Sequence, residues 1–158
     1  MSSRILFRKI NIGERIHATA AIIDDMALIS TVDRSLIGID LRKGEIIWKK
    51  PVEGPVVSSP CVVDNKMIVG CRDGSVYCND IKTGESIWTL PTGAAVHSSP
   101  VSDGRNVYLG NDAGRLYKID AENGLALQIK STEDQIRSSA IISDSRLIVG
   151  GIWLHIFD

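Results

Sequence analysis

The stretch that decides the fold reads VSSPCVVDNKMIVG over residues 57–70, and it returns as HSSPVSDGRNVYLG over residues 97–110. Related stretches stand 40 residues before and after these two, over residues 17–30 and 137–150. A fixed period of this length is typical of repeat proteins in which each unit is one small supersecondary element. Three columns keep the period best: Thr19, Ser59, Ser99 and Ser139; Ser30, Gly70, Gly110 and Gly150; Asp40, Asp80 and Asp120.

Each unit has the pattern of several short strands. In the second unit, runs rich in β-branched and aromatic residues are separated by Asn, Asp and Gly, and no helical periodicity is present. The pattern predicts strands over residues 56–63, 66–70, 75–79 and 85–89. The last turn of a unit begins with an aspartate, which can cap backbone amides, and has a glycine four residues later. That glycine can take the positive φ of a bulged hairpin loop.

Four such units predict an all-β fold, a β-propeller of four-stranded antiparallel blades. Stacking the sheets side by side covers their faces and leaves only short edges. The approximate blades are residues 14–54, 55–94, 95–134 and 135–158. A stacked β-solenoid is the competing architecture, but its rungs are usually shorter. Trp48 and Trp88 stand eight residues after their aspartates, and we expect them to pack between neighbouring outer strands.

The two ends of the chain are predicted to complement each other. The last unit is two residues shorter after Gly150 and has room for three strands, while residues 4–13 align with residues 45–54, with Phe7 in the place of Trp48. A strand over residues 4–10 is therefore expected to complete the last blade, which favours a complete module over a piece of a longer polypeptide. One chain could close as a four-bladed ring, or two chains could exchange these strands in an eight-bladed homodimer. Aromatic residues make up only 5% of the chain, too few for the bulky packing of four splayed blades, which favours the homodimer.

Composition limits the function classes. The chain has 158 residues, of which 44% are apolar and 23% charged, and its formal net charge is −1. Both signs of charge are scattered, which does not indicate a nucleic-acid or membrane-surface binder. The apolar run over residues 1–9 is shorter than a signal peptide is expected to need, and no apolar stretch of 18 residues is present. Cys61, Cys71 and Cys78 lack CxxC spacing and are expected to be reduced thiols of a cytoplasmic protein.

Residues 57–70, followed by residues 74–77 and 84–88, resemble the pyrroloquinoline-quinone (PQQ) repeat family, and residues 97–100, 106–110 and 115–120 repeat the match. The resemblance covers essentially the whole chain. It implies a propeller in a family that includes quinone-dependent alcohol and glucose dehydrogenases, outer-membrane assembly lipoproteins and scaffold propellers. The dehydrogenases hold quinone against two adjacent cysteines beside a calcium ion, whereas the three cysteines here are separated. WD repeats fit less well, because Gly-His and Trp-Asp pairs are absent. We therefore expect no cofactor and no metal.

The side chains directly before the Ser-Ser-Pro positions, residues 58–60 and 98–100 and their equivalents, are expected to face the central channel. They are His17, Val57, His97 and Arg137. Three of them could form a small-ligand or anion site, or they could be the solvated wall of a channel. Ligands on separate blades are expected to lie too far apart for a metal ion. His155 is expected to be a half-buried strand histidine.

The function expected from the sequence is a non-enzymatic scaffold for protein–protein interaction. The serines recur in every unit, where a catalytic residue would need no copies, and no Gly-x-Ser-x-Gly or phosphate-binding loop is present. A small-ligand or anion sensor at His17, His97 and Arg137 is the first alternative, and a quinone-dependent oxidoreductase is the second. The expected protein contacts are turn residues that depart from the repeat: Arg34, Arg72, Asp112 and Arg115.

Overall fold

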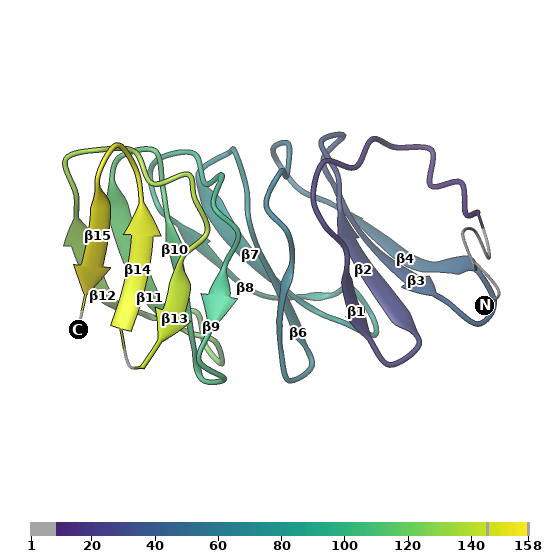
Figure 1. The fold of residues 1–158 in the computed structure, drawn as a ribbon. Coiled ribbons are helices and arrows are strands. Elements are labelled where there is room, and N and C mark those ends of the chain that lie inside the picture. Colours follow the sequence, from purple (N-terminus) through teal and green to yellow (C-terminus); the bar gives the residue numbers. More distant parts are fainter. Residues whose placement is uncertain (1–8, 145, 158) are drawn as a thin grey trace, which may run out of the picture.

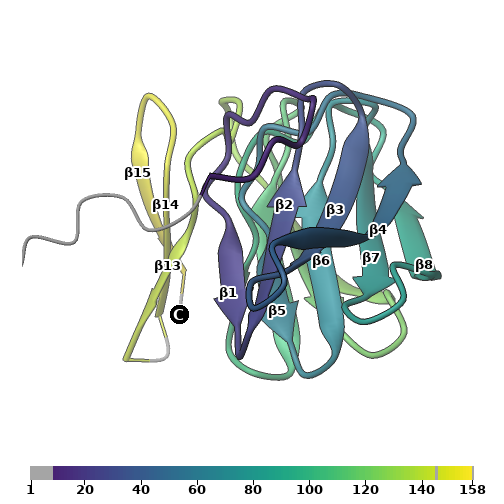
Figure 2. The same ribbon diagram turned by 90° about the vertical axis from the view of Figure 1, so that its right-hand side faces the viewer.

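A computed structural model describes residues 9–144 and 146–157. These residues form strands, turns and loops without a helix, arranged in four antiparallel sheets. The sheets stand side by side in chain order, the first at one end of the row and the last at the other (Figure 1). Viewed along the row, the last sheet stands to one side of the first three, so the row is curved (Figure 2). The predicted repeat of antiparallel sheets is confirmed.

Three sheets have four strands, and the last has three among the described residues. The first contains β1 (Ala21–Ile23), β2 (Met26–Ser30), β3 (Ser35–Asp40) and β4 (Glu45–Pro51). The second contains β5 (Cys61–Val63), β6 (Lys66–Gly70), β7 (Ser75–Asp80) and β8 (Ser86–Pro91). The third contains β9 (Val101–Ser102), β10 (Asn106–Gly110), β11 (Arg115–Asp120) and β12 (Ala126–Ser131). The last contains β13 (Ile141–Ser143), β14 (Arg146–Gly150) and β15 (Leu154–Phe157).

The aspartates that recur every 40 residues, Asp40, Asp80 and Asp120, form the predicted caps. Asp80 Oδ1 accepts hydrogen bonds of 2.9 Å from the amides of both Lys82 and Thr83, and Gly84 has a φ of +71°. The strand register shifts just before this turn, as a β-bulge requires. The turns that begin at Asp40 and Asp120 are built in the same way.

Apolar clusters fill the spaces between neighbouring sheets. Val63, Ile68 and Cys78 of the second sheet pack against Val107 and Ile119 of the third. A similar cluster joins the first sheet to the second, and a smaller one joins the third to the last. Neighbouring sheets therefore bury apolar faces against each other along the row.

The inner strand of the second unit is shorter than predicted. It begins at Cys61 rather than at residue 56. Ser58 Oγ donates to the Gly70 carbonyl at 2.7 Å and accepts from the Gly70 amide at 2.9 Å, and Pro60 has no amide hydrogen. The residues before Cys61 are therefore bonded to a strand end and do not continue the ladder.

The last unit follows the predicted pattern in part. Gly150 pairs with Leu154, whereas Gly70 pairs with Val76, so the last hairpin is shorter by two residues as expected. Of the predicted strand over residues 4–10, residues 4–8 lie outside the described residues. Lys9 and Ile10 are described and are not part of a strand. The described residues do not form the four-bladed ring, because their first and last sheets lie at opposite ends of the row (Figure 1).

Candidate functional site

Hairpin tips and connecting segments form one face of the molecule, along the upper edge of Figure 1. We call this surface the loop face; it comprises the tips 31–34, 71–74, 111–114 and 151–153 and the segments 13–19, 52–59, 92–99 and 132–139. Backbone hydrogen bonds link each segment to the preceding tip. The amides of Val56, Val96 and Ile136 donate to the carbonyls of residues 31, 71 and 111 at 2.9–3.0 Å. The loop face is therefore tied to the sheets below it.

Two of the predicted channel residues meet on this face. Arg137 donates through Nε and Nη2 to the two carboxylate oxygens of Asp112 at 2.9 and 2.8 Å, and His97 Nε2 lies 3.5 Å from Asp112 Oδ2. The hydrogen bond from Arg137 lowers the pKa of Asp112. Burial lowers the pKa of His97 and outweighs the opposing attraction of Asp112, so His97 is neutral at pH 7. The positive charge of Arg137 is thus matched by one carboxylate, which does not favour an anion site.

The third channel residue, His17, belongs to the first unit and is exposed. It lies near Asp33, which Arg15 binds through its backbone amide at 2.8 Å and through Nη2 at 2.6 Å. The hydrogen bonds from Arg15 lower the pKa of Asp33 to about 2, and the charge of a protonated His17 adds a smaller effect. His17 is therefore not brought into the cluster formed by His97 and Arg137.

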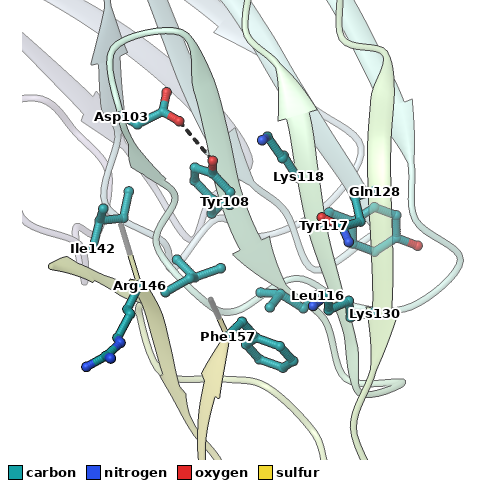
Figure 3. Close-up of a pocket in the computed structure, with 11 residues that line it drawn as sticks. Asp103, Tyr108, Leu116, Tyr117, Lys118, Gln128, Lys130, Ile142, Arg146 and Phe157 are labelled. Atoms are coloured by element: carbon teal, nitrogen blue, oxygen red, sulfur yellow. Dashed lines mark hydrogen bonds between the residues drawn. The ribbon is translucent and has the colours of Figure 1, made fainter. Parts of the chain in front are cut away.

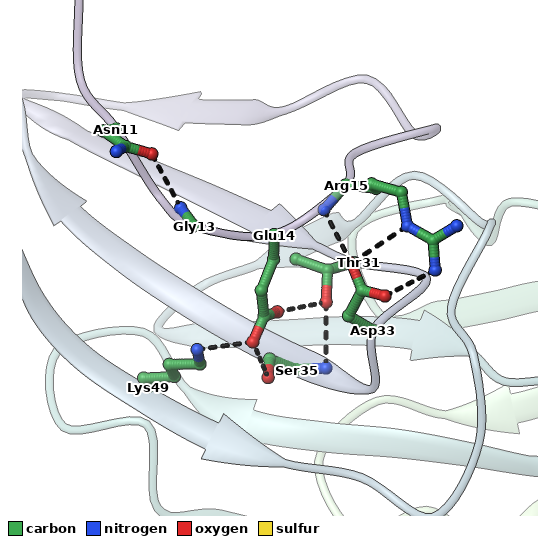
Figure 4. A network of polar contacts seen from close by, with 8 residues as sticks. All are labelled: Asn11, Gly13, Glu14, Arg15, Thr31, Asp33, Ser35 and Lys49. Carbon is green, nitrogen blue, oxygen red and sulfur yellow. Dashed lines mark hydrogen bonds and ion pairs between the residues drawn. The ribbon is translucent and has the colours of Figure 1, made fainter.

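A polar network fixes the start of the described chain to the first sheet (Figure 4). The Glu14 carboxylate accepts from Thr31 Oγ1 at 2.6 Å and from Ser35 Oγ at 3.1 Å, and it forms an ion pair with Lys49. Burial alone would raise the pKa of Glu14, but the hydrogen bonds from Lys49, Thr31 and Ser35 outweigh it and lower the pKa. Sequence reasoning missed this residue. Its only signal was a glutamate where the second, third and last units have glycine, alanine and aspartate.

A groove opens on the loop face between the third and last units. Its volume is about 750 Å³. Acidic, basic and apolar side chains line it together, and Ile152 at its rim is 82% exposed. The lining side chains include Asp112, Glu133, Asp134, Gln135, Arg137 and Ile152. Of the four contact residues predicted from the sequence, only Asp112 lines this groove.

A second cavity, of about 500 Å³, separates the third sheet from the last (Figure 3). Gln128 lines it at the position that tryptophan occupies in the first two units, and the shorter side chain leaves the space open. The Tyr108 hydroxyl donates to Asp103 at 2.8 Å. Burial and this hydrogen bond raise the pKa of Tyr108 to about 12, so the phenol stays protonated. Lys130 Nζ lies 4.9 Å from the ring centroid of Phe157 across the cavity.

The thiols are not arranged as nucleophiles or as ligands. Cys61, Cys71 and Cys78 are free, and burial raises the pKa of Cys71 to about 11 and that of Cys78 to about 12. Buried thiols with a raised pKa are unreactive at neutral pH. Within residues 9–144 and 146–157, no group of three or more His, Cys, Asp or Glu side chains is placed to hold a metal ion. The same residues contain no helix that could cross a membrane.

Comparison with known proteins identifies a matching family and solved structures with a similar fold. The family model for the outer membrane protein assembly factor BamB matches residues 8–151. The crystal structure of BamB from Moraxella catarrhalis superposes with a TM-score of 0.84 at 24% identity, over 94% of this chain and 48% of that one. The computationally designed Ika4 protein superposes with a TM-score of 0.84 at 16% identity, over 96% and 98% of the two chains.

A quinohemoprotein alcohol dehydrogenase from Comamonas testosteroni superposes with a TM-score of 0.76 at 19% identity, over 87% of this chain and 29% of that one. At these identities the likeness of the solved structures establishes the fold alone. The chain spans about half of the BamB chain. The comparison with curated protein sequences gives no significant match.

Proposed function

Because the chain belongs to the family of the outer membrane protein assembly factor BamB, a family of PQQ-repeat propellers, we propose that it is a non-enzymatic scaffold that binds a protein partner through its loop face. The resemblance to PQQ repeats predicted from the sequence is confirmed. The observation that carries the proposal is the groove between the third and last units. There an exposed Ile152 stands beside charged side chains held on a hydrogen-bonded frame.

The groove has the composition of a protein-binding surface. Interfaces combine an apolar anchor with a polar rim, and a preformed surface loses little conformational entropy on binding. Ile152 supplies the apolar anchor here. Glu133 and Asp134 add acidic side chains, while Asp112 and Arg137 balance each other. The partner that fits is an extended peptide segment with an apolar residue next to lysine or arginine.

The recurrent polar side chains have structural roles, which supports the non-enzymatic assignment. Ser58, Ser98 and Ser138 each donate to and accept from the backbone of the glycine twelve residues later. A hydroxyl engaged in this way donates its hydrogen to a backbone carbonyl and not to a base that could activate it. The separated cysteines likewise do not reproduce the quinone site of the dehydrogenases. Free thiols favour a reducing compartment, so we assign the protein to the cytoplasm.

Selection of peptides from a library displayed on phage tests the proposal. We expect enrichment of peptides that combine basic and apolar residues, and we expect Ile152→Asp to reduce their binding at least tenfold. Lys82→Glu serves as the control, because Lys82 is exposed in a turn between β7 and β8, outside the loop face. Failure to enrich any peptide class, or equal binding by Ile152→Asp and the parent chain, would contradict the proposal.

Addition of pyrroloquinoline quinone with calcium tests the enzymatic alternative. A ligand that binds the folded state raises the melting temperature. We expect no shift with quinone and calcium, whereas a saturable rise would favour an oxidoreductase over a scaffold.

A further inference from the structure

One apolar side chain on the loop face differs in exposure from its counterparts in the other units. Val56 and Val96 are fully buried, and Ile136 is 1% exposed. Ile16 holds the same position in the first unit, but it is 39% exposed. In the later units the side chain packs on the preceding sheet, and the first unit has no preceding sheet in the row.

A position that could receive this exposed side chain lies open at the other end of the row. A Cβ atom on Gly70 would lie 2.2 Å from Val96, and one on Gly110 would lie 2.1 Å from Ile136, so each glycine receives the next unit's apolar side chain. Gly150 is the third of these glycines. A Cβ atom added to Gly150 would have the Ser138 hydroxyl as its nearest neighbour, at 3.4 Å. An apolar side chain is thus missing at Gly150.

The sheet face beside Gly150 is also apolar and exposed. Ile141, Leu154 and Ile156 are 62%, 70% and 58% exposed. The strand register places Ile141, Ile148 and Ile156 in one row across the last sheet. The same row in the second sheet packs against the third sheet and contains Cys61, Ile68 and Cys78. The exposed face therefore has the position of an inter-sheet contact.

The first sheet carries the complementary face. Its residues Ala27, Ile29, Ile37 and Ile39 form one cluster, and their counterparts in the third sheet face the second sheet. The segment over residues 10–12 packs on this cluster. The amide of Val32 donates to the Arg15 carbonyl as that of Arg72 does to Pro55, so this segment is shifted by one residue from the predicted alignment of residues 4–13 with residues 45–54. Ile10 and Ile12 therefore hold the positions of Leu90 and Val52, which reach the next sheet from the end of a fourth strand. The segment thus lies where the fourth strand of a preceding sheet would end.

A row of hydroxyl contacts also stops at the two ends. The amide of Thr19 donates to Ser59 Oγ at 2.9 Å, that of Ser59 to Ser99 Oγ at 2.8 Å, and that of Ser99 to Ser139 Oγ at 3.3 Å. Each contact joins neighbouring units. The next step in this row would run from the amide of Ser139 to the hydroxyl of a Thr19 outside the chain.

We propose that the face of β13–β15 binds the first sheet of a second copy of this chain. Ile16 of the second copy packs on Gly150, and its residues 10–12 lie where a fourth strand beside β15 would end. Two such contacts related by a two-fold axis close a ring of eight sheets. A second copy fits better than the chain's own first sheet, because that sheet lies at the far end of the row (Figure 1). Gly150 also lines the groove, so the contact adjoins the proposed peptide site, but the solution mass tests the dimer separately from peptide binding.

Solution mass from light scattering, measured over a dilution series, tests the proposal. We expect the mass of two chains for the parent protein, and the mass of one chain with an unchanged circular dichroism spectrum for Ile16→Asp and Gly150→Val. Ile87→Asp is the matched control, because Ile87 is 41% exposed although both neighbouring sheets are present, and it should stay dimeric. A parent protein with the mass of one chain would overturn the proposal, as would an Ile16→Asp variant that stays dimeric.

Cross-linking tests the contact without disrupting it. Thr19→Cys and Ser139→Cys are made as separate variants in a Cys61→Ala background, which removes the half-buried native thiol. After oxidation we expect a disulfide-linked dimer when the two variants are mixed and none from either alone. A disulfide that forms within one chain carrying both substitutions, without linked dimers, would show closure by a single chain and overturn the proposal.

Discussion

The indole nitrogen of Trp48 donates a hydrogen bond of 2.8 Å to the carbonyl of Ile81, in the turn of the next sheet. Trp88 makes the same contact with Ala121 at 3.0 Å, one unit later. Each tryptophan also covers the glycine of that turn, since a Cβ on Gly84 would lie 2.6 Å from the Trp48 ring. The predicted role of these tryptophans between neighbouring outer strands is confirmed. One side chain therefore fixes both the distance and the register of two sheets.

Gly124→Ala should be more destabilising than Gly93→Ala. Both glycines have a φ of about +70 to +80°, where alanine costs about 1 to 2 kcal/mol. At Gly124 the added Cβ would also lie 2.6 Å from the Trp88 ring, whereas nothing lies within 4 Å of it at Gly93. Urea unfolding of the two variants measures the difference, which we expect to be about 1 to 3 kcal/mol. Equal losses would mean that Trp88 moves aside without cost.

Ser98→Ala should cost more stability than Ser138→Ala. Each hydroxyl bridges the amide and carbonyl of a glycine, but Ser98 is 1% exposed and Ser138 is exposed. Removing the buried Ser98 hydroxyl leaves two buried backbone groups without a partner, which costs about 1 to 3 kcal/mol. Water can take the place of the exposed Ser138 hydroxyl. Urea unfolding midpoints compare the two variants. A larger loss for Ser138→Ala would contradict this reasoning.

The parts of the fold that were predictable are those that every unit shares. The turns at Asp40, Asp80 and Asp120 could be read from the sequence because an Asx cap and a positive-φ glycine are local requirements. Trp48 and Trp88 could be placed because their period matched that of the turns they cover. Local chemistry and a fixed period suffice for contacts of this kind.

The parts of the site that were not predictable depend on residues that occur in one unit only. Asp112 was expected to be a contact residue, but its ion pair with Arg137 bridges 25 positions and follows no repeat. Glu14 binds side chains from three separate strands or tips, which only the folded chain brings together. A repeat identifies what the units share and cannot reveal such single contacts.

The three cysteines should differ in their reactivity toward a thiol reagent. Burial raises the pKa of all three thiols, but Cys71 and Cys78 are fully buried, whereas Cys61 is half-buried. At pH 7 we expect Cys71 and Cys78 to react at least a hundredfold more slowly in the native protein than in urea, since the thiolate is the reactive species. Labelling with iodoacetamide followed by peptide mass spectrometry measures each site. Rapid native labelling of Cys78 would indicate that the second and third sheets separate readily.

The Glu14 network should make stability depend on pH at the acid end. The folded state lowers the pKa of Glu14 below its ordinary value of 4.5, so the unfolded chain binds this proton more readily. The stabilisation is therefore present in full above pH 4.5 and is lost as the pH falls through the lower folded-state pKa. Glu14→Gln keeps an acceptor for Thr31 and Ser35 but removes the charge that pairs with Lys49.

We accordingly expect Glu14→Gln to lower stability by about 1 to 2 kcal/mol at pH 7, because a charge-assisted contact of a largely buried carboxylate is lost. The difference from the parent chain should shrink steadily below pH 4.5, since the parent then loses the same charge. Melting temperatures from pH 7 to pH 2.5 provide the measurement. Glu133→Gln removes an exposed carboxylate from the groove and should leave the curve unchanged. A Glu14→Gln difference that stays constant across this range would show that shape and hydrogen bonding, and not charge, hold the segment against the first sheet.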